Sequence, residues 1–300
     1  MRRLFFFILS IFLAFSLHSS ERFTGSLLWK ISGNNLEKPS YILGSHHLIP
    51  ISFADSITGL NDAMNNTQRI VGEIDLTDLE QIRSSVVSYM AIPDPSMYRS
   101  LMKEDVLSKL TDRLSSYMGI ASDNIYMLKP NAVNFIYLKT LCVDIFPDYD
   151  PLTSISIDQH IQDRARKEGK IITGLETAEE QAVLLFNSQP LDEQMAQLSC
   201  TVENSPVFIN ELKRQVDYYK QRDLHTLYIM AKQTENSLCR LSGNDMEPLN
   251  EKRNRKWCQI IPALMADMPN LIVVGAMHLP GEEGLLNLLS RMGYSVEAVN

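Results

Sequence analysis

The segment Leu271-Ile-Val-Val-Gly-Ala-Met-His278 decides the fold, because an apolar run ends at a glycine and a histidine follows three residues later. Three more runs share this punctuation: Tyr41-Ile-Leu-Gly-Ser-His-His47, Arg69-Ile-Val-Gly-Glu-Ile-Asp75 and Ile171-Ile-Thr-Gly-Leu-Glu176. Each run is short and rich in large or β-branched apolar residues, as buried parallel strands are, and each stops where glycine lets the backbone turn sharply. The sequence therefore predicts an α/β fold with a mixed, mainly parallel sheet.

The polar residues after these runs fall at the predicted strand ends. In open α/β sheets, ligands bind just beyond the carboxyl ends of the strands. We therefore expect the imidazoles of His47 and His278 and the carboxylates of Glu73 and Glu176 to converge there from distant parts of the chain. Such a cluster can hold a divalent metal ion or perform acid/base chemistry.

These candidates differ in how specific their signals are. His47 and His278 are the strongest pair, because both close a Gly-x-x-His motif after an apolar run. Glu73 offers an oxygen ligand or a general base. Glu176 has two readings, since an acid in the first turn of the next helix can simply stabilise that helix. His46 is either a second contact of the site or an exposed neighbour of His47.

The region around Trp257 gives an independent clue. An apolar helical stripe begins there, and continued backwards at intervals of three and four it reaches Asn254, Arg253 and Asn250. A buried arginine needs an anion, so its guanidinium could clamp a site carboxylate or stabilise a developing oxyanion. Asp158 could anchor a similar network.

The N-terminus predicts a signal peptide over residues 1–20. Arg2 and Arg3 precede a short apolar core, and small and polar residues follow it. The core is too short to span a bilayer comfortably, so we expect cleavage and a secreted or periplasmic protein, with an uncleaved anchor as the alternative. Loss of the two arginines takes the net charge from −8 to −10, which argues against nucleic acid and anionic membranes as partners.

Four cysteines would reach the oxidising compartment after export, namely Cys142, Cys200, Cys239 and Cys258. None forms a Cys-x-x-Cys pair, so a zinc–thiolate site is not indicated. We expect one or two structural disulfides among the three possible pairings, with buried unpaired thiols as the alternative.

The rest of the chain predicts one α/β domain over residues 21–300 with two helical insertions, at about 78–157 and 178–247. A hairpin opens the domain. Helices are expected over residues 104–118 and 247–267, among others. Two capping-box signatures mark helix starts, at Thr177 with Glu180 and at Thr77 with Glu80.

Taken together, these motifs resemble the TraB/GumN family, which includes the Tiki proteases. The matching segments are Tyr41–His47, Val71–Asp75, Ile157-Asp158, Gly174–Thr177, Glu180-Gln181, Arg253-Asn254 with Trp257, Val274–Leu279, Gly284–Leu286 and Gly293–Glu297. The resemblance implies an α/β fold related to erythromycin-esterase-like and ChaN-like proteins. It also implies a metal-dependent peptidase in which His47, His278 and Glu73 form the site, with Arg253 and Asn254 supporting it.

Two departures from the family pattern stand out. His46 occupies a position where many relatives have a small or apolar residue. The chain also shows no C-terminal transmembrane segment of the kind that animal Tiki proteins carry, so we expect no stable membrane insertion after signal removal.

These observations lead to one hypothesis and three alternatives. The hypothesis is a metallohydrolase acting on peptides or proteins, in which His47, His278 and Glu73 hold a divalent ion such as manganese, cobalt or zinc and its bound water attacks the carbonyl. Glu176 or Glu73 itself would take the proton, and Arg253 would offset negative charge. The alternatives are a metal-free hydrolase of the erythromycin-esterase type, a haem- or metal-binding protein without catalysis, and a vestigial site.

Overall fold

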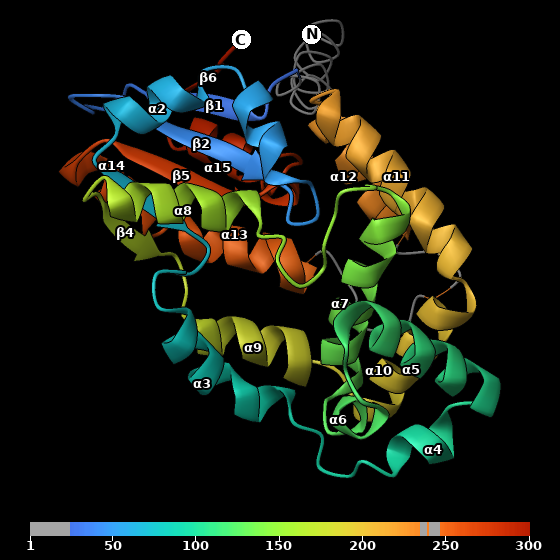
Figure 1. The fold of residues 1–300 in the computed structure, drawn as a ribbon. Helices are drawn as coiled ribbons and strands as arrows, with labels where there is room; N and C mark the ends of the chain where they lie inside the picture. Colours follow the sequence, from blue (N-terminus) through green and yellow to red (C-terminus); the bar gives the residue numbers. More distant parts are fainter. Residues whose placement is uncertain (1–24, 235–238, 240–246) are drawn as a thin grey trace, which may run out of the picture.

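The computed structural model describes residues 25–234, 239 and 247–300, and it contains a six-stranded sheet with the order β4-β3-β5-β2-β1-β6 (Figure 1). The strands are β1 (Leu28–Ser32), β2 (Ser40–Ser45), β3 (Arg69–Gly72), β4 (Ile171–Gly174), β5 (Asn270–Gly275) and β6 (Ser295–Ala298). β5 runs parallel to both β2 and β3, and β3 runs parallel to β4, whereas β1 is antiparallel to β2 and β6. The predicted α/β fold with a mixed, mainly parallel sheet is confirmed.

The strand register aligns the four glycines of the apolar runs at one edge of the sheet. Gly72 of β3 lies opposite Gly174 of β4, and Gly275 of β5 lies opposite Ser45, the residue after Gly44. Because these strands are parallel, the residues that follow the glycines all leave the sheet from the same edge.

Helices make up most of the remaining described chain. They are α2 (Leu60–Asn66), α3 (Leu79–Met90), α4 (Met97–Leu101), α5 (Glu104–Met118), α6 (Ser122–Tyr126), α7 (Pro130–Leu141), α8 (Ile157–Lys167), α9 (Ala178–Asn187), α10 (Leu191–Glu203), α11 (Ser205–Lys220), α12 (Leu224–Thr234), α13 (Lys252–Trp257), α14 (Ile261–Asp267) and α15 (Leu285–Arg291). The 3₁₀ helices are η1 (Ile51–Ser56), η2 (Cys142–Asp144) and η4 (Ala276–His278), and η3 (Glu247–Glu251) is a π-helix.

The apolar side chains form two main cores. The first surrounds the sheet and includes Trp29, Ile70 and Val273, which are buried together with side chains of α2, α8, α14 and α15. The second contains Tyr98 and Leu198 and joins α4, α5, α6, α7 and α10, which we call the helical unit. The helical unit lies away from the sheet, and α3 and α9 pack side by side next to it (Figure 1). The two predicted insertions therefore pack against each other.

The helix expected over residues 247–267 is wrong as a single element. The chain there forms the π-helix η3, then α13, and after a break at residues 258–260 the separate helix α14. Pro262 lies in the first turn of α14, where its missing N–H costs nothing, whereas in the middle of a longer helix it would remove a hydrogen bond.

The two predicted capping boxes have different outcomes. Thr177 and Glu180 form the reciprocal pair at the start of α9, with hydrogen bonds of 3.1 and 2.9 Å. The box at Thr77 is wrong, because Asp78 caps α3 by accepting a hydrogen bond from the backbone N–H of Gln81. Thr77 instead donates to the side chain of Asp75.

The cysteines form one disulfide, between Cys200 and Cys239, while Cys142 and Cys258 are buried free thiols. This outcome agrees with the expectation of one or two disulfides. The predicted signal peptide, residues 1–20, lies outside the described residues. Within the described ranges, no helix combines the length and the hydropathy needed to cross a bilayer.

Candidate active site

Three side chains from three strand ends surround one point, next to the last residue of β5. A Cβ atom added to Gly275 would lie 3.3 Å from Glu73 Oε1, 3.7 Å from His278 Cδ2 and 3.8 Å from His47 Nε2. The structure thus brings together the three residues that the sequence predicted as metal ligands. We call His47, Glu73 and His278, with Glu176 and Arg253, the strand-edge cluster.

His278 is a neutral imidazole with a defined tautomer. The side-chain amide of Asn254 donates to the backbone carbonyls of His278 and Glu283, so its Oδ1 is an acceptor and His278 Nδ1–H donates to it at 2.7 Å. His278 Nε2 then carries the lone pair and accepts from Arg253 Nη1 at 3.1 Å. Burial lowers the pKa of His278 to about 3. Asn254 therefore positions the imidazole.

His47 has the opposite electrostatic setting. Its Nδ1 lies 3.1 Å from Asp158 Oδ2, while Ser45 Oγ donates to the other oxygen of Asp158 at 2.6 Å. The Asp158 charge raises the pKa of His47 to about 9. Burial favours the neutral acid at Asp158, but His47 and the two hydrogen bonds hold the pKa of Asp158 below its usual range. His47 is therefore cationic at neutral pH unless another cation replaces its proton.

Glu73 is held by donors on both oxygens. Oε1 accepts the backbone N–H of Gly275 at 2.8 Å, and Oε2 accepts from Arg253 Nη2 at 2.5 Å and from Gln181 Nε2 at 3.1 Å. Burial alone would raise its pKa, but the neighbouring His278 imidazole, the charges of Arg253 and His47 and the Gly275 N–H lower the pKa of Glu73 to about 2. The carboxylate remains ionised at neutral pH.

Arg253 joins the two carboxylates, as a buried guanidinium requires. Its Nε and Nη2 donate to Glu176 at 3.1 and 2.6 Å, while Nη2 also reaches Glu73. The guanidinium lies 4.6 Å above the ring of Trp257, and that ring also packs against His278. Glu176 is thus an ion-pair partner of Arg253 inside the cluster, so its side chain does more than begin a helix.

Sequence reasoning missed two contributors to the site. Gln181 donates to both Glu73 and Glu176, from the first turn of α9. Ser45 holds Asp158 and also donates to the carbonyl of Val274. Both residues lie in segments that resemble the family, with Ser45 directly after Gly44 and Gln181 seven residues after Gly174, but neither position by itself indicated a role in the site.

His46 lies beside the cluster and has a different role. Its ring packs edge-on against Tyr219, with 5.3 Å between the ring centres, and its Nδ1 accepts the backbone N–H of Leu48 at 3.3 Å. Burial lowers the pKa of His46 to about 4. The structure therefore places His46 in packing contacts with Tyr219.

The donor set fits a divalent ion by its chemistry. His47 and His278 both engage Nδ1 with a side-chain oxygen and turn the other side of the ring toward Gly275, the arrangement in which a carboxylate or amide orients a metal-ligating histidine. Over the described part of the chain, however, no group of three or more His, Cys, Asp or Glu residues is close enough to hold a metal. Binding would require the three side chains to move closer together and Arg253 Nη1 to leave His278 Nε2.

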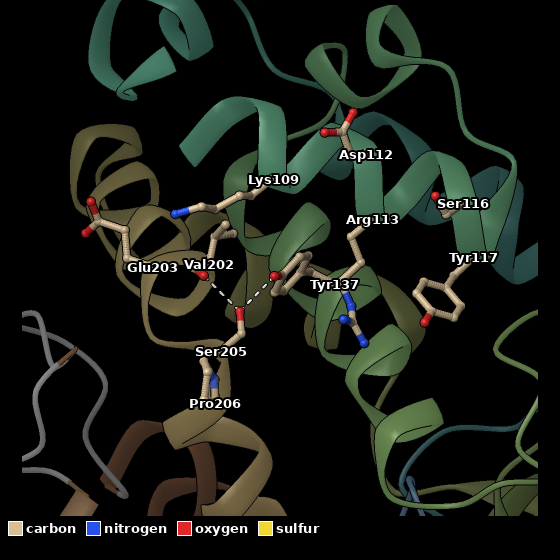
Figure 2. Close-up of a pocket in the computed structure, with 10 residues that line it drawn as sticks. All are labelled: Lys109, Asp112, Arg113, Ser116, Tyr117, Tyr137, Val202, Glu203, Ser205 and Pro206. Atoms are coloured by element: carbon tan, nitrogen blue, oxygen red, sulfur yellow. Dashed lines mark hydrogen bonds between the residues drawn. The ribbon is translucent and has the colours of Figure 1, made fainter. Parts of the chain in front are cut away.

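A separate hollow, of about 570 Å³, lies in the helical unit between α5, α7 and the junction of α10 with α11 (Figure 2). Arg113 is its central cation, but this guanidinium is already paired with Asp144 and bonded to Thr140. Tyr137 is hydrogen-bonded to Ser205 across the hollow. The hollow shares no residue with the strand-edge cluster and contains no histidine.

The order of these motifs along the chain can be compared with known families. The sequence profile described as the TraB/PrgY/gumN family matches residues 27–298. The chain belongs to this family. The match covers every residue of the strand-edge cluster, so the cluster lies within the TraB/PrgY/gumN region. No curated protein and no solved structure matches the chain.

Proposed function

We propose that this TraB/PrgY/gumN protein is a metal-dependent hydrolase, most simply a peptidase, that activates water at the strand-edge cluster. The convergence of His47, Glu73 and His278 around Gly275 carries the proposal. A divalent ion held by these three residues would acidify a bound water, and mixed nitrogen and carboxylate donors suit manganese, cobalt or zinc. A peptide substrate is the choice that follows from the resemblance to Tiki proteases.

The chain's own residues have distinct tasks in this scheme. Asn254 and Asp158 fix the two imidazole rings, because each binds an Nδ1. Glu176, which is paired with Arg253, would accept the proton of the attacking water. Arg253 already spans both carboxylates, so its guanidinium can shift its donors toward an oxyanion as negative charge develops there.

A metal-free hydrolase is the second candidate, and one contact favours it. Arg253 Nη1 donates to His278 Nε2, which would otherwise be a metal ligand. The guanidinium therefore occupies the lone pair that a metal ion would need. In this version, His47 in its cationic form protonates the leaving group, and a carboxylate activates water directly.

The deciding experiment measures metal content and hydrolysis on the same preparations. The mature protein would be assayed with a proteome-derived peptide library, with and without chelator and with added manganese, cobalt or zinc. His47→Ala and His278→Ala would be compared with His225→Ala, a histidine on α12 outside the cluster. The proposal is supported if the wild type binds about one equivalent of metal and hydrolyses peptides, and if both cluster variants lose the metal and the hydrolysis.

Other outcomes separate the alternatives. Chelator-resistant turnover without metal, abolished by both cluster substitutions, rejects the metal mechanism and supports the second candidate. Bound metal or a haem absorption band without hydrolysis of any substrate rejects both hydrolase versions.

A further inference from the structure

We propose that a cleft between α7, α9 and α10 binds an aromatic side chain of the substrate, next to the bond that is cut. The inference rests on the proposed function and adds a substrate class to it. We call this cleft the side-chain cleft. Its apolar wall is formed by Phe135, Leu138, Leu184, Leu185, Phe186 and Leu249.

The size of the side-chain cleft selects its occupant. It is open to solvent on one side and has a volume of about 170 Å³. A cavity of about 150 Å³ lined by Leu, Ile and Phe binds benzene, so a phenylalanine ring fits here and a lone methyl group would leave most of the volume empty. Phe135, at one side of it, keeps 56% of its surface exposed, which a bound ring would cover.

The chemistry of the lining selects in the same direction. None of the residues that form the side-chain cleft is charged; its polar members are amides and one serine. A charged side chain would therefore lose its water without gaining a partner.

Two elements connect the side-chain cleft to the strand-edge cluster. Gln181 on α9 donates to Glu73 and Glu176, and Leu184 and Leu185 follow three and four residues later, on the same helical face. One turn of helix is about 5 Å long, comparable to one or two residues of extended peptide. Independently, the carbonyl of Leu249 accepts from Arg253 Nη1 at 3.0 Å. A peptide with its reacting bond in the cluster therefore has a neighbouring side chain within reach of the cleft.

The test uses the full mature chain and peptides that differ only at the residues flanking the cut bond, with Phe, Leu, Ala or Asp. Wild type should favour Phe over Ala by about 10- to 100-fold in kcat/KM. Leu138→Trp fills the cleft and should reduce this preference to about 2-fold while Ala peptides remain substrates. Val207→Trp, an exposed position on α11, is the control for added bulk.

A binding measurement keeps this inference separate from the proposed function. N-acetylphenylalanine amide would be titrated by NMR into Glu73→Gln and into the same variant with Leu138→Trp added. The inference is supported, even without hydrolysis, if Glu73→Gln binds this compound saturably and the variant that also carries Leu138→Trp does not. If hydrolysis does not depend on the flanking residue, or if wild type and Leu138→Trp show the same preference for Phe, the inference is overturned. The proposed hydrolase function is not affected by this outcome.

Discussion

The two Gly-x-x-His motifs have nearly the same local sequence and opposite electrostatics. His47 is half exposed, with 52% of its side chain accessible, and is paired with the carboxylate of Asp158, whereas His278 is buried and paired with the amide of Asn254. The pKa of His47 is raised to about 9, and that of His278 is lowered to about 3. The motif fixes where each ring lies, whereas the Asp158 carboxylate on α8 favours the cationic form of His47 and burial keeps His278 neutral.

The largest effect on stability is expected for Arg253, the residue that donates to His278 Nε2. Arg253→Ala leaves Glu73 and Glu176 buried without their cation, which should lower the free energy of unfolding by about 3–5 kcal/mol at pH 7. Urea unfolding followed by circular dichroism measures this loss. The exposed neighbour Arg255 is the matched control, and its substitution by alanine should cost about 1 kcal/mol or less. A similar small loss for both variants would show that Arg253 does not compensate these carboxylates.

A second substitution tests whether both motifs act at one point. In Gly275→Ala the new methyl group lies between the two imidazoles and Glu73, with its closest contact 3.3 Å from Glu73 Oε1. Its φ of −54° suits alanine, so the stability should change by about 1 kcal/mol or less. Hydrolysis or metal affinity should fall by about 10-fold or more, because the methyl group occupies the convergence point. Unchanged activity in a folded variant would separate His47 from His278 functionally.

A third substitution makes the His47 motif resemble the His278 motif. Asp158→Asn keeps the shape of the partner and removes its charge, so the pKa of His47 should fall by about 1–3 units. Titration of the imidazole resonances by NMR reads this shift directly. The pKa of His278, whose ring is held by Asn254, should stay low. A rise in the pKa of His278 comparable to the fall for His47 would show that the two settings are not independent, because the His47 charge lowers the pKa of His278.

The glycine-ended apolar runs were enough to place His47, Glu73, Glu176 and His278 at one edge of the sheet, because parallel strands bring their carboxyl ends together. The helical stripe also pointed Arg253 and Asn254 inward, although the helix carrying them is broken before Pro262. Periodicity reports which face of an element is buried, and it says nothing of side-chain rotamers.

The hydrogen-bond partners inside the cluster therefore could not be predicted from the sequence. Arg253 bridges two carboxylates and also binds His278, whereas Gln181 donates to both acids, and each contact depends on how helices from separate segments dock on the sheet edge. The same holds for the disulfide: Cys200 and Cys239 are 39 residues apart, and spacing alone allowed three pairings.

The smallest expected effect concerns stability against pH. Because the folded pKa of His47 lies above the usual 6.5, its pairing with Asp158 stabilises the fold fully below pH 6.5 and is lost as the pH rises through about 9. Half of the His47 side chain is exposed to solvent, so the contribution is about 1 kcal/mol or less. The difference in unfolding free energy between wild type and His47→Gln, measured from pH 6 to 10, should shrink across this window. A constant difference would mean that His47 does not carry the extra proton, and the contrast between the two histidines would then reduce to exposure alone.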